Sequence, residues 1–208
     1  VIVHTMLALQ KHPDITSIAV VCLCGWETVL HSYAHQYNVT KLHWIFPGGG
    51  NGQESIANGI YGLKENGVKE DDLVLIHDAV RPLVSQGIIS SNIAICKQYG
   101  YAITGIQCRE AILESDDGFY STTSIPRDKL IRTQPPQTFR LTNIIKSHEE
   151  ARQKGIRNSV SSCTLLAELG GYEMHIVPGE ERNIKITTTE DLEIFKVLMQ
   201  TSKEDWLK

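Results

Sequence analysis

The stretch of residues 73–82 constrains the fold more than any other part of the sequence. Four apolar residues open this stretch, and His77 and Asp78 follow them directly. A short apolar run bounded by polar residues predicts a buried strand. Open α/β sheets bind ligands at the carboxyl ends of their strands, so Asp78, His77 and the nearby Arg81 favour a site for a metal and a nucleotide. The alternative is an ordinary strand end at which a solvated Asp78 pairs with Arg81.

Apolar runs of strand length alternate with amphipathic runs of helix length along the chain. This alternation predicts a three-layer α/β/α sandwich with a mostly parallel sheet. We expect strands at residues 17–24, 42–46, 73–76, 101–106, 172–177 and 183–186. We expect helices at residues 1–10, 26–37, 54–64, 85–98, 141–154, 163–169 and 190–199. Regular structure should break at residues 134–137, which contain two prolines. No repeat or linker divides the pattern, so we expect a single domain over residues 1–208.

Composition excludes several classes of function. The net charge is -4 and the basic residues form no stripe, so we expect no nucleic-acid partner. The longest apolar run, residues 18–24, is too short to cross a bilayer and follows no positively charged leader. The five cysteines are scattered and lack the paired spacing of a zinc site. We therefore expect a cytoplasmic protein with reduced thiols and no membrane partner.

A glycine-rich segment lies between the second predicted strand and the next helix. Residues 47–55 read Pro-Gly-Gly-Gly-Asn-Gly-Gln-Glu-Ser. Glycines in such a turn let backbone amides approach a ligand without obstruction from side chains. The spacing matches neither a dinucleotide fingerprint nor a Walker loop, and a mobile surface loop is the commoner explanation of such a segment.

A hairpin signal interrupts the alternating pattern. Residues 111–115 and 119–124 flank the turn sequence Asp-Asp-Gly at 116–118. An isolated hairpin is marginally stable in water, so it must pack against something else. We expect either an arm that docks on a second subunit or an edge hairpin that folds back on its own sheet.

Three separated motifs resemble the cytidylyltransferases that act on polyol phosphates. They are His-Asp-Ala-Val-Arg-Pro at 77–82, Gln-Pro-Pro-Gln-Thr-Phe at 134–139, and Asn-Ile-Lys-Ile-Thr-Thr at 183–188 with Glu-Asp-Leu at 190–192. The motifs follow the family's order along the whole chain. The two families that it resembles act on 2-C-methyl-D-erythritol 4-phosphate and on ribitol 5-phosphate. The resemblance implies a Rossmann-like nucleotidyltransferase fold, CTP as co-substrate with Mg²⁺ or another divalent cation, and a homodimer interlocked through arms at about residues 108–127.

The resemblance also implies roles for individual residues. Asp78 matches the metal-binding aspartate of the family, and Arg81 lies beside the substrate. Arg127 on the arm and Lys185 match the basic residues that position the acceptor phosphate, and Ser161 falls in the acceptor pocket. Without the resemblance, the favoured interpretation is that Arg127 is a solvated arm residue and Lys185 a lysine at a strand end. The residues that match the nucleotide site are Gly49, Gly50, Asn51, Gly52, Gln53, Glu54, Ser55 and Ala79.

The sequence also departs from the family pattern. Gly52 stands where the family usually carries an arginine, Ala111 where it has an arm threonine, and Ser162 where it has an aspartate. Relatives begin with a strand and a glycine-rich loop whose arginine and lysine hold the triphosphate. Those residues would lie before Val1, and we expect the natural protein to have them.

The implied reaction transfers CMP from CTP to a polyol phosphate and yields a CDP-polyol and pyrophosphate. Trp26, Val80 and the arm residues 112–115 resemble the ribitol enzymes more than the methylerythritol enzymes. Two alternatives stay open. One is a non-catalytic nucleotide-binding relative, which the departures at Gly52, Ala111 and Ser162 favour, and the other is a nucleotidyltransferase for another sugar phosphate.

Overall fold

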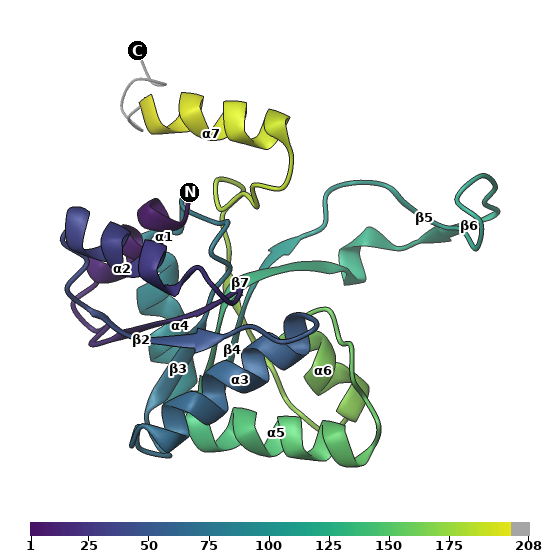
Figure 1. Cartoon of the computed structure of the whole chain (residues 1–208). Helices are drawn as coiled ribbons and strands as arrows, with labels where there is room; N and C mark the ends of the chain where they lie inside the picture. The colour runs from purple at the N-terminus through teal and green to yellow at the C-terminus, as the bar shows by residue number, and fades with distance from the viewer. Residues whose placement is uncertain (201–208) are drawn as a thin grey trace.

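The computed structural model describes residues 1–200 and confirms the expected alternation of helices and strands (Figure 1). Residues 201–208 of the expected domain lie outside this described part. The helices are α1 (Ile2–Gln10), α2 (Glu27–Gln36), α3 (Gly52–Glu65), α4 (Gln86–Tyr99), α5 (Leu141–Gln153), α6 (Ser162–Leu169) and α7 (Thr189–Gln200), with the 3-10 helix η1 (Arg127–Lys129). The strands are β1 (Ile18–Cys22), β2 (Leu42–Pro47), β3 (Leu73–Ile76), β4 (Tyr101–Gln107), β5 (Ile112–Glu114), β6 (Thr123–Ile125), β7 (Ile131–Arg140) and β8 (His175–Pro178). Within this part, no helix has the length and apolarity needed to cross a membrane.

The strands form one larger sheet, one strand pair and the hairpin. The larger sheet has the order β3-β7-β4-β8, and β1 pairs in parallel with β2. Strand β4 is parallel to β8, whereas β7 is antiparallel to both of its neighbours. Strands β3, β4 and β8 therefore run in one direction, as a mostly parallel sheet requires, and β7 is the reversed strand.

The expectation that residues 134–137 break regular structure is wrong, because β7 runs through them. The register of β4 against β7 shifts at this point: Ile103 pairs with Gln137 and Thr104 pairs with Gln134. Pro135 and Pro136 thus fall in an irregularity and have no partner residue in β4. Proline cannot donate to a ladder, and at an irregularity the missing N–H costs no hydrogen bond.

The expected strand at residues 183–186 is also absent from the described structure. This segment runs in extended coil between β8 and α7. Its main link to the rest of the backbone is the amide of Ile186, which donates to the carbonyl of Val80 at 2.9 Å. A single backbone hydrogen bond is not enough for this segment to form a strand of the sheet.

Helices cover both faces of the larger sheet, which confirms the three layers. On one face α3, α5 and α6 pack around Phe139, Leu141, Ile144 and Leu166, all of which have no exposed surface. On the other face α4 buries its apolar side against the strands through residues such as Ile89. The fold is therefore held from both sides at β7 and β4.

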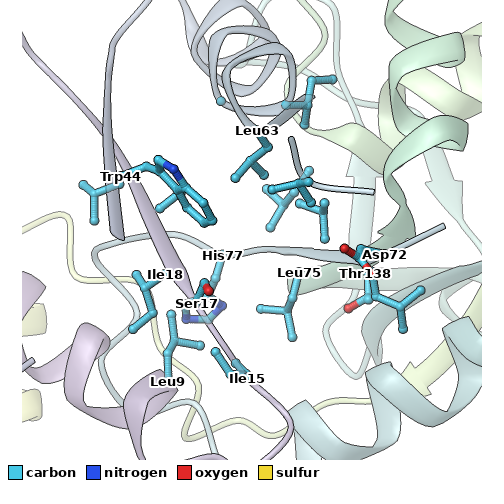
Figure 2. A pocket seen from close by; sticks show the side chains of 18 of the residues that line it. Leu9, Ile15, Ser17, Ile18, Trp44, Leu63, Asp72, Leu75, His77 and Thr138 are labelled. Carbon is cyan, nitrogen blue, oxygen red and sulfur yellow. The ribbon is translucent and has the colours of Figure 1, made fainter. Parts of the chain in front are cut away.

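A cavity of about 830 Å³ separates β1 from β3. Within the described residues, β1 pairs only with β2 and β3 only with β7, so each strand has an unpaired edge. Side chains of both strands line the cavity, together with residues of α1 and α3. Figure 2 shows Trp44, Leu63, Leu75 and His77 around this space. We call the boundary between β1 and β3 the open seam.

The hairpin β5-β6 projects from the body as an arm (Figure 1). It pairs with no other strand among the described residues, so it does not fold back on the sheet. The backbone amides of Phe119 and Tyr120 donate to Asp117 at its tip, and these hydrogen bonds lower the pKa of the Asp117 carboxyl. Phe119 and Tyr120 are 85% and 82% exposed, so the apolar tip is not covered by any other part of the described structure.

Candidate active site

The structure brings Asp78 and Lys185 together from distant parts of the sequence. Asp78 follows β3 directly, and its Oδ2 lies 3.6 Å from the Nζ of Lys185. The Nε of Arg81 donates to the same oxygen at 3.2 Å. The other oxygen, Oδ1, has no hydrogen bond or ion pair with any described residue. One carboxylate thus meets two cations on one side and keeps its other oxygen free.

Exposure sets the strength of these ion pairs. The side chains of Lys185 and Asp78 are 51% and 39% exposed, so their pairing contributes at most about 1 kcal/mol. Arg81 is only 13% exposed and holds Asp78 from the protein side. Lys185 can therefore exchange Asp78 for an anionic ligand at little cost, whereas Arg81 stays in place.

His77 is a structural residue at this strand end. Its Nε2 lies 3.0 Å from the carbonyl of Arg81 and donates to it, because a carbonyl can only accept. Burial lowers the pKa of His77, so the ring is neutral at physiological pH. Its Nδ1 is buried and has no hydrogen-bond partner among residues 1–200, and the residue lines the cavity at the open seam (Figure 2).

The glycine-rich loop is held by hydrogen bonds rather than left loose. The amide of Gly49 donates to the Ser55 hydroxyl at 3.0 Å, and Ser55 donates to the carbonyl of Asn51 at 2.9 Å. A Cβ at Gly49 would lie 2.3 Å from the Cβ of Glu54, so only glycine fits there. Asn51 accepts from the amide of Glu54 at 2.9 Å and caps α3, which begins at Gly52, inside the segment expected to be loop.

The start of α3 lies close to the end of β3. Ser55, Asp78 and Ala79 line the same cavity. A helix amino terminus favours negative charge, and in this chain the amide of Gly50 already donates to the Glu54 carboxylate at 2.7 Å. The side chain of Gln53 faces another way: it is buried and bonds to Ile156 and Ser159. Gln53 thus ties the loop to the segment that precedes α6.

Two predicted site residues make other contacts. Arg127 lies in η1 at the base of the arm, where its Nη1 donates to the carbonyl of Arg109 at 2.7 Å. Within residues 1–200 no hydrogen bond or ion pair joins it to Asp78 or Lys185. Ser161 caps α6 in a reciprocal pair of hydrogen bonds with Thr164. The neighbouring Ser162 hydroxyl is buried and has no hydrogen-bond partner in the described part of the chain.

Sequence reasoning missed two residues that hold this region. The hydroxyl of Thr5 in α1 donates to the carbonyl of Ala79 at 2.7 Å. A threonine inside a helix gives no sequence signal for such a contact. Asn183 is fully buried beside the Lys185 segment. It was visible in the motif at 183–188, but the motif alone gave it no role.

The donor set bears on metal binding. No cluster of three or more His, Cys, Asp or Glu side chains suited to a metal occurs within residues 1–200. A lone carboxylate with a free oxygen, such as Asp78, fits an ion that takes most of its ligands from phosphate oxygens and water, as Mg²⁺ does.

A family model described as IspD, 2-C-methyl-D-erythritol 4-phosphate cytidylyltransferase, matches residues 1–201. The chain belongs to this family. The ribitol-5-phosphate cytidylyltransferase of Lacticaseibacillus paracasei is 32% identical over 202 residues, which cover 96% of this chain and 86% of the relative. The 2-C-methyl-D-erythritol 4-phosphate cytidylyltransferase of Clostridium acetobutylicum is 33% identical over 207 residues, which cover 96% of this chain and 85% of that protein.

Solved structures of IspD proteins share the fold. The 4-diphosphocytidyl-2C-methyl-D-erythritol synthase of Anaerococcus prevotii superposes with a TM-score of 0.84 at 23% identity, over 96% of this chain and 86% of that one. The expected nucleotidyltransferase fold and the expected enzyme class, a cytidylyltransferase, are both confirmed.

Proposed function

We propose that this IspD-family chain transfers CMP from CTP to a polyol phosphate. A phosphate oxygen of the acceptor attacks the α-phosphorus of CTP, a new P–O bond forms, and the bond to the β-phosphate breaks to release pyrophosphate. The acceptor oxygen is ionised at neutral pH, so no general base is needed. The observation that carries the proposal is the pairing of Asp78 with Lys185 at the end of β3, next to the glycine-rich loop.

Positioning and charge neutralisation supply most of the catalysis in such a reaction. Lys185 gives up its exposed contact with Asp78 and holds the acceptor phosphate. Arg81 keeps the Asp78 carboxylate oriented from the buried side. The loop of residues 49–55 binds the nucleotide through backbone groups and Ser55, Ala79 lies against the nucleotide, and Ser161 lies in the acceptor pocket.

A divalent cation fits the free Oδ1 of Asp78. When bound, such an ion neutralises the triphosphate charge that develops during transfer. The Oδ2 of Asp78 stays with Arg81, so the chain can hold the carboxylate in one orientation while its other oxygen faces the ligand.

The arm supports a homodimer in which Arg127 acts in the site of the second copy. The exposed rings of Phe119 and Tyr120 give the arm an apolar tip that needs a partner. Among residues 1–200, the Arg127 side chain makes one hydrogen bond, from Nη1 to the carbonyl of Arg109 at the base of the arm. We propose the cytoplasm as the location of this enzyme.

We also propose that a strand encoded before Val1 fills the cavity at the open seam. The unpaired edges of β1 and β3 both line this cavity, and one added strand would pair with both. Its carboxyl end would reach Asp78, Ala79 and Ser55, where a following loop would meet the triphosphate. The partnerless Nδ1 of His77, which also lies at the cavity, would gain a polar neighbour.

The two candidate acceptors are named in two groups of relatives, and both groups have similar sequence identity to this chain. We favour ribitol 5-phosphate over 2-C-methyl-D-erythritol 4-phosphate, because Trp26, Val80 and residues 112–115 resemble the ribitol enzymes. Trp26 is 56% exposed and lies at the start of α2.

The test measures pyrophosphate release from CTP with each acceptor separately, using the full-length protein. We expect release with ribitol 5-phosphate. Lys185→Ala should lower transfer about 10- to 150-fold, since a charge-assisted hydrogen bond is worth roughly 1.5–3 kcal/mol. Lys64→Ala, which removes an exposed lysine of α3, is the matched control and should have no effect.

Thermal unfolding with CTP separates the alternatives, because a ligand that binds only the native state raises its stability. A rise in Tm without pyrophosphate release from any polyol phosphate would support a non-catalytic nucleotide-binding protein. Release only with another sugar phosphate would change the acceptor. Equal turnover of wild type and Lys185→Ala would remove Lys185 from the site.

A further inference from the structure

Asn183 joins three parts of the molecule below the candidate site. It has no exposed surface. Its Nδ2 donates to the carbonyl of Pro135 in β7 at 2.7 Å and lies 3.4 Å from the Oε1 of Gln134. Its own carbonyl accepts from the Nη1 of Arg81 at 2.5 Å. The residue therefore connects the sheet, the Arg81 side chain and the coil that follows β8.

These contacts close a ring around the ion pair. Arg81 donates through Nη1 to Asn183 and through Nε to Asp78. Two residues after Asn183, Lys185 returns to the Oδ2 of Asp78. Both halves of the Asp78–Lys185 pair are thus fixed from the same residue: Asp78 through Arg81, which donates to the backbone carbonyl of Asn183, and Lys185 through the backbone that follows Asn183.

Secondary structure does not place Lys185. Residues 179–188 contain no helix or strand, so individual hydrogen bonds of side chains and backbone must set the path of this coil. Farther along, the amide of Ile186 donates to Val80 at 2.9 Å. Asn183 and Ile186 therefore clamp the coil on either side of Lys185. The buried amide of Asn183 holds this path firmly, because its removal would leave the carbonyl of Pro135 without that donor.

We propose that Asn183 is the positioning residue that sets the placement of Lys185 relative to Asp78 during CMP transfer. The proposal rests on the proposed function of the site. Asn183 does not touch the substrate; it acts through Arg81 and through the coil. A displacement of a positioned group by about 1 Å can lower a rate by roughly a hundredfold, so a lost anchor should be visible in turnover.

Asn92 offers a matched control. It is also an asparagine without exposed surface, and its Nδ2 donates to Thr104 at 2.8 Å and to Ile88 at 3.1 Å. It has no hydrogen bond to Asp78, Arg81 or Lys185 among the described residues. Asn92→Ala and Asn183→Ala should therefore both lower stability, while only Asn183→Ala should alter the site.

The experiment is a double-mutant cycle on kcat/KM for the polyol phosphate. We expect Asn183→Ala to lower kcat/KM by roughly 10- to 100-fold. Adding Lys185→Ala to it should cause little further loss, because both changes remove the same interaction. Asn92→Ala should leave kcat/KM unchanged, both alone and when added to Lys185→Ala. Multiplying losses for Asn183 and Lys185, or equal effects of Asn183→Ala and Asn92→Ala, would overturn the proposal.

Hydrogen exchange of the Ile186 amide gives a readout that needs no activity. Exchange should become faster in Asn183→Ala and stay unchanged in Asn92→Ala, with the β4 and β7 amides protected in both. Should Asn183→Ala not fold, Asn183→Asp retains the shape and removes the donor. An inactive wild type would overturn the proposed function alone. An unchanged Ile186 rate would overturn the role of Asn183.

Discussion

The two sides of β3 differ in how they are packed. On the side of β7, strands pair continuously to β8, and Phe139 and Leu166 are fully buried between the sheet and its helices. On the side of β1, the open seam leaves a cavity of about 830 Å³, and every residue of β3 is only half-buried. The comparison shows that the packing that stabilises β3 and the residue it supplies to the site lie in different places. Strand β3 is anchored on the β7 side and presents Asp78 at its end.

Paired leucine truncations give the largest expected effect. Leu166 in α6 has no exposed surface, whereas Leu63 in α3 is half-buried and faces the cavity (Figure 2). Leu166→Ala should lower the free energy of unfolding by about 2–5 kcal/mol, because it creates a new void. Leu63→Ala should cost about 1 kcal/mol, since its side chain already borders empty space. Urea denaturation measures both, and equal losses would show that the open seam is packed as tightly as the β7 side.

Acid sensitivity should also belong to the tightly packed side. His148 in α5 is 5% exposed, and its Nε2 has no hydrogen-bond partner among the residues that the structure describes. Burial lowers its pKa to about 4. Above pH 6.5 the ring is neutral in both the folded and the unfolded state. As the pH falls from 6.5 to 4 only the unfolded chain gains the proton, so stability should fall by up to about 3 kcal/mol.

His148→Gln should flatten this pH dependence, as measured by urea denaturation at several pH values. His31→Gln is the control, because His31 is exposed on α2, beyond the open seam. A wild-type stability that does not change between pH 6.5 and 4 would contradict a neutral, buried His148.

The smallest expected effect is local and concerns α7. The Oδ2 of Asp191 accepts from the amides of Thr187 and Thr188 at 2.8 and 2.9 Å, and these hydrogen bonds lower its pKa to about 2. The stability that the ionised Asp191 carboxylate gives to the start of α7 is therefore present above pH 3.8 and is lost as the pH falls toward 2. Asp191→Asn should speed hydrogen exchange in α7 and leave the urea midpoint unchanged. A large shift of that midpoint would tie α7 to the packed side of the sheet.

Local signals in the sequence were enough where one segment determines its own structure. Four apolar residues between Asp72 and His77 gave β3 with its correct bounds. The glycine at position 100, which adopts a positive φ, ended α4 as expected. These elements follow from periodicity and caps, which lie within a few residues of each other.

Contacts between distant segments were beyond such signals. Pro135 and Pro136 argue against a strand on local grounds, and only the shifted register of β4 makes room for them. The carbonyl of Pro135 accepts a hydrogen bond from Asn183, and Asn183 in turn anchors the coil that carries Lys185. The family resemblance brought Asp78 and Lys185 into one hypothesis, but the anchor that links them depends on a three-dimensional path.

The uneven distribution of empty volume makes hydrostatic pressure a selective tool on this protein. Pressure favours states that lose internal void, and its effect scales with the void that disappears. In any form of the chain whose seam stays open, compression should therefore act first between β1 and β3. The sheet from β3 to β8 should unfold only at higher pressure. The two sides of β3 would therefore lose their structure one after the other rather than together.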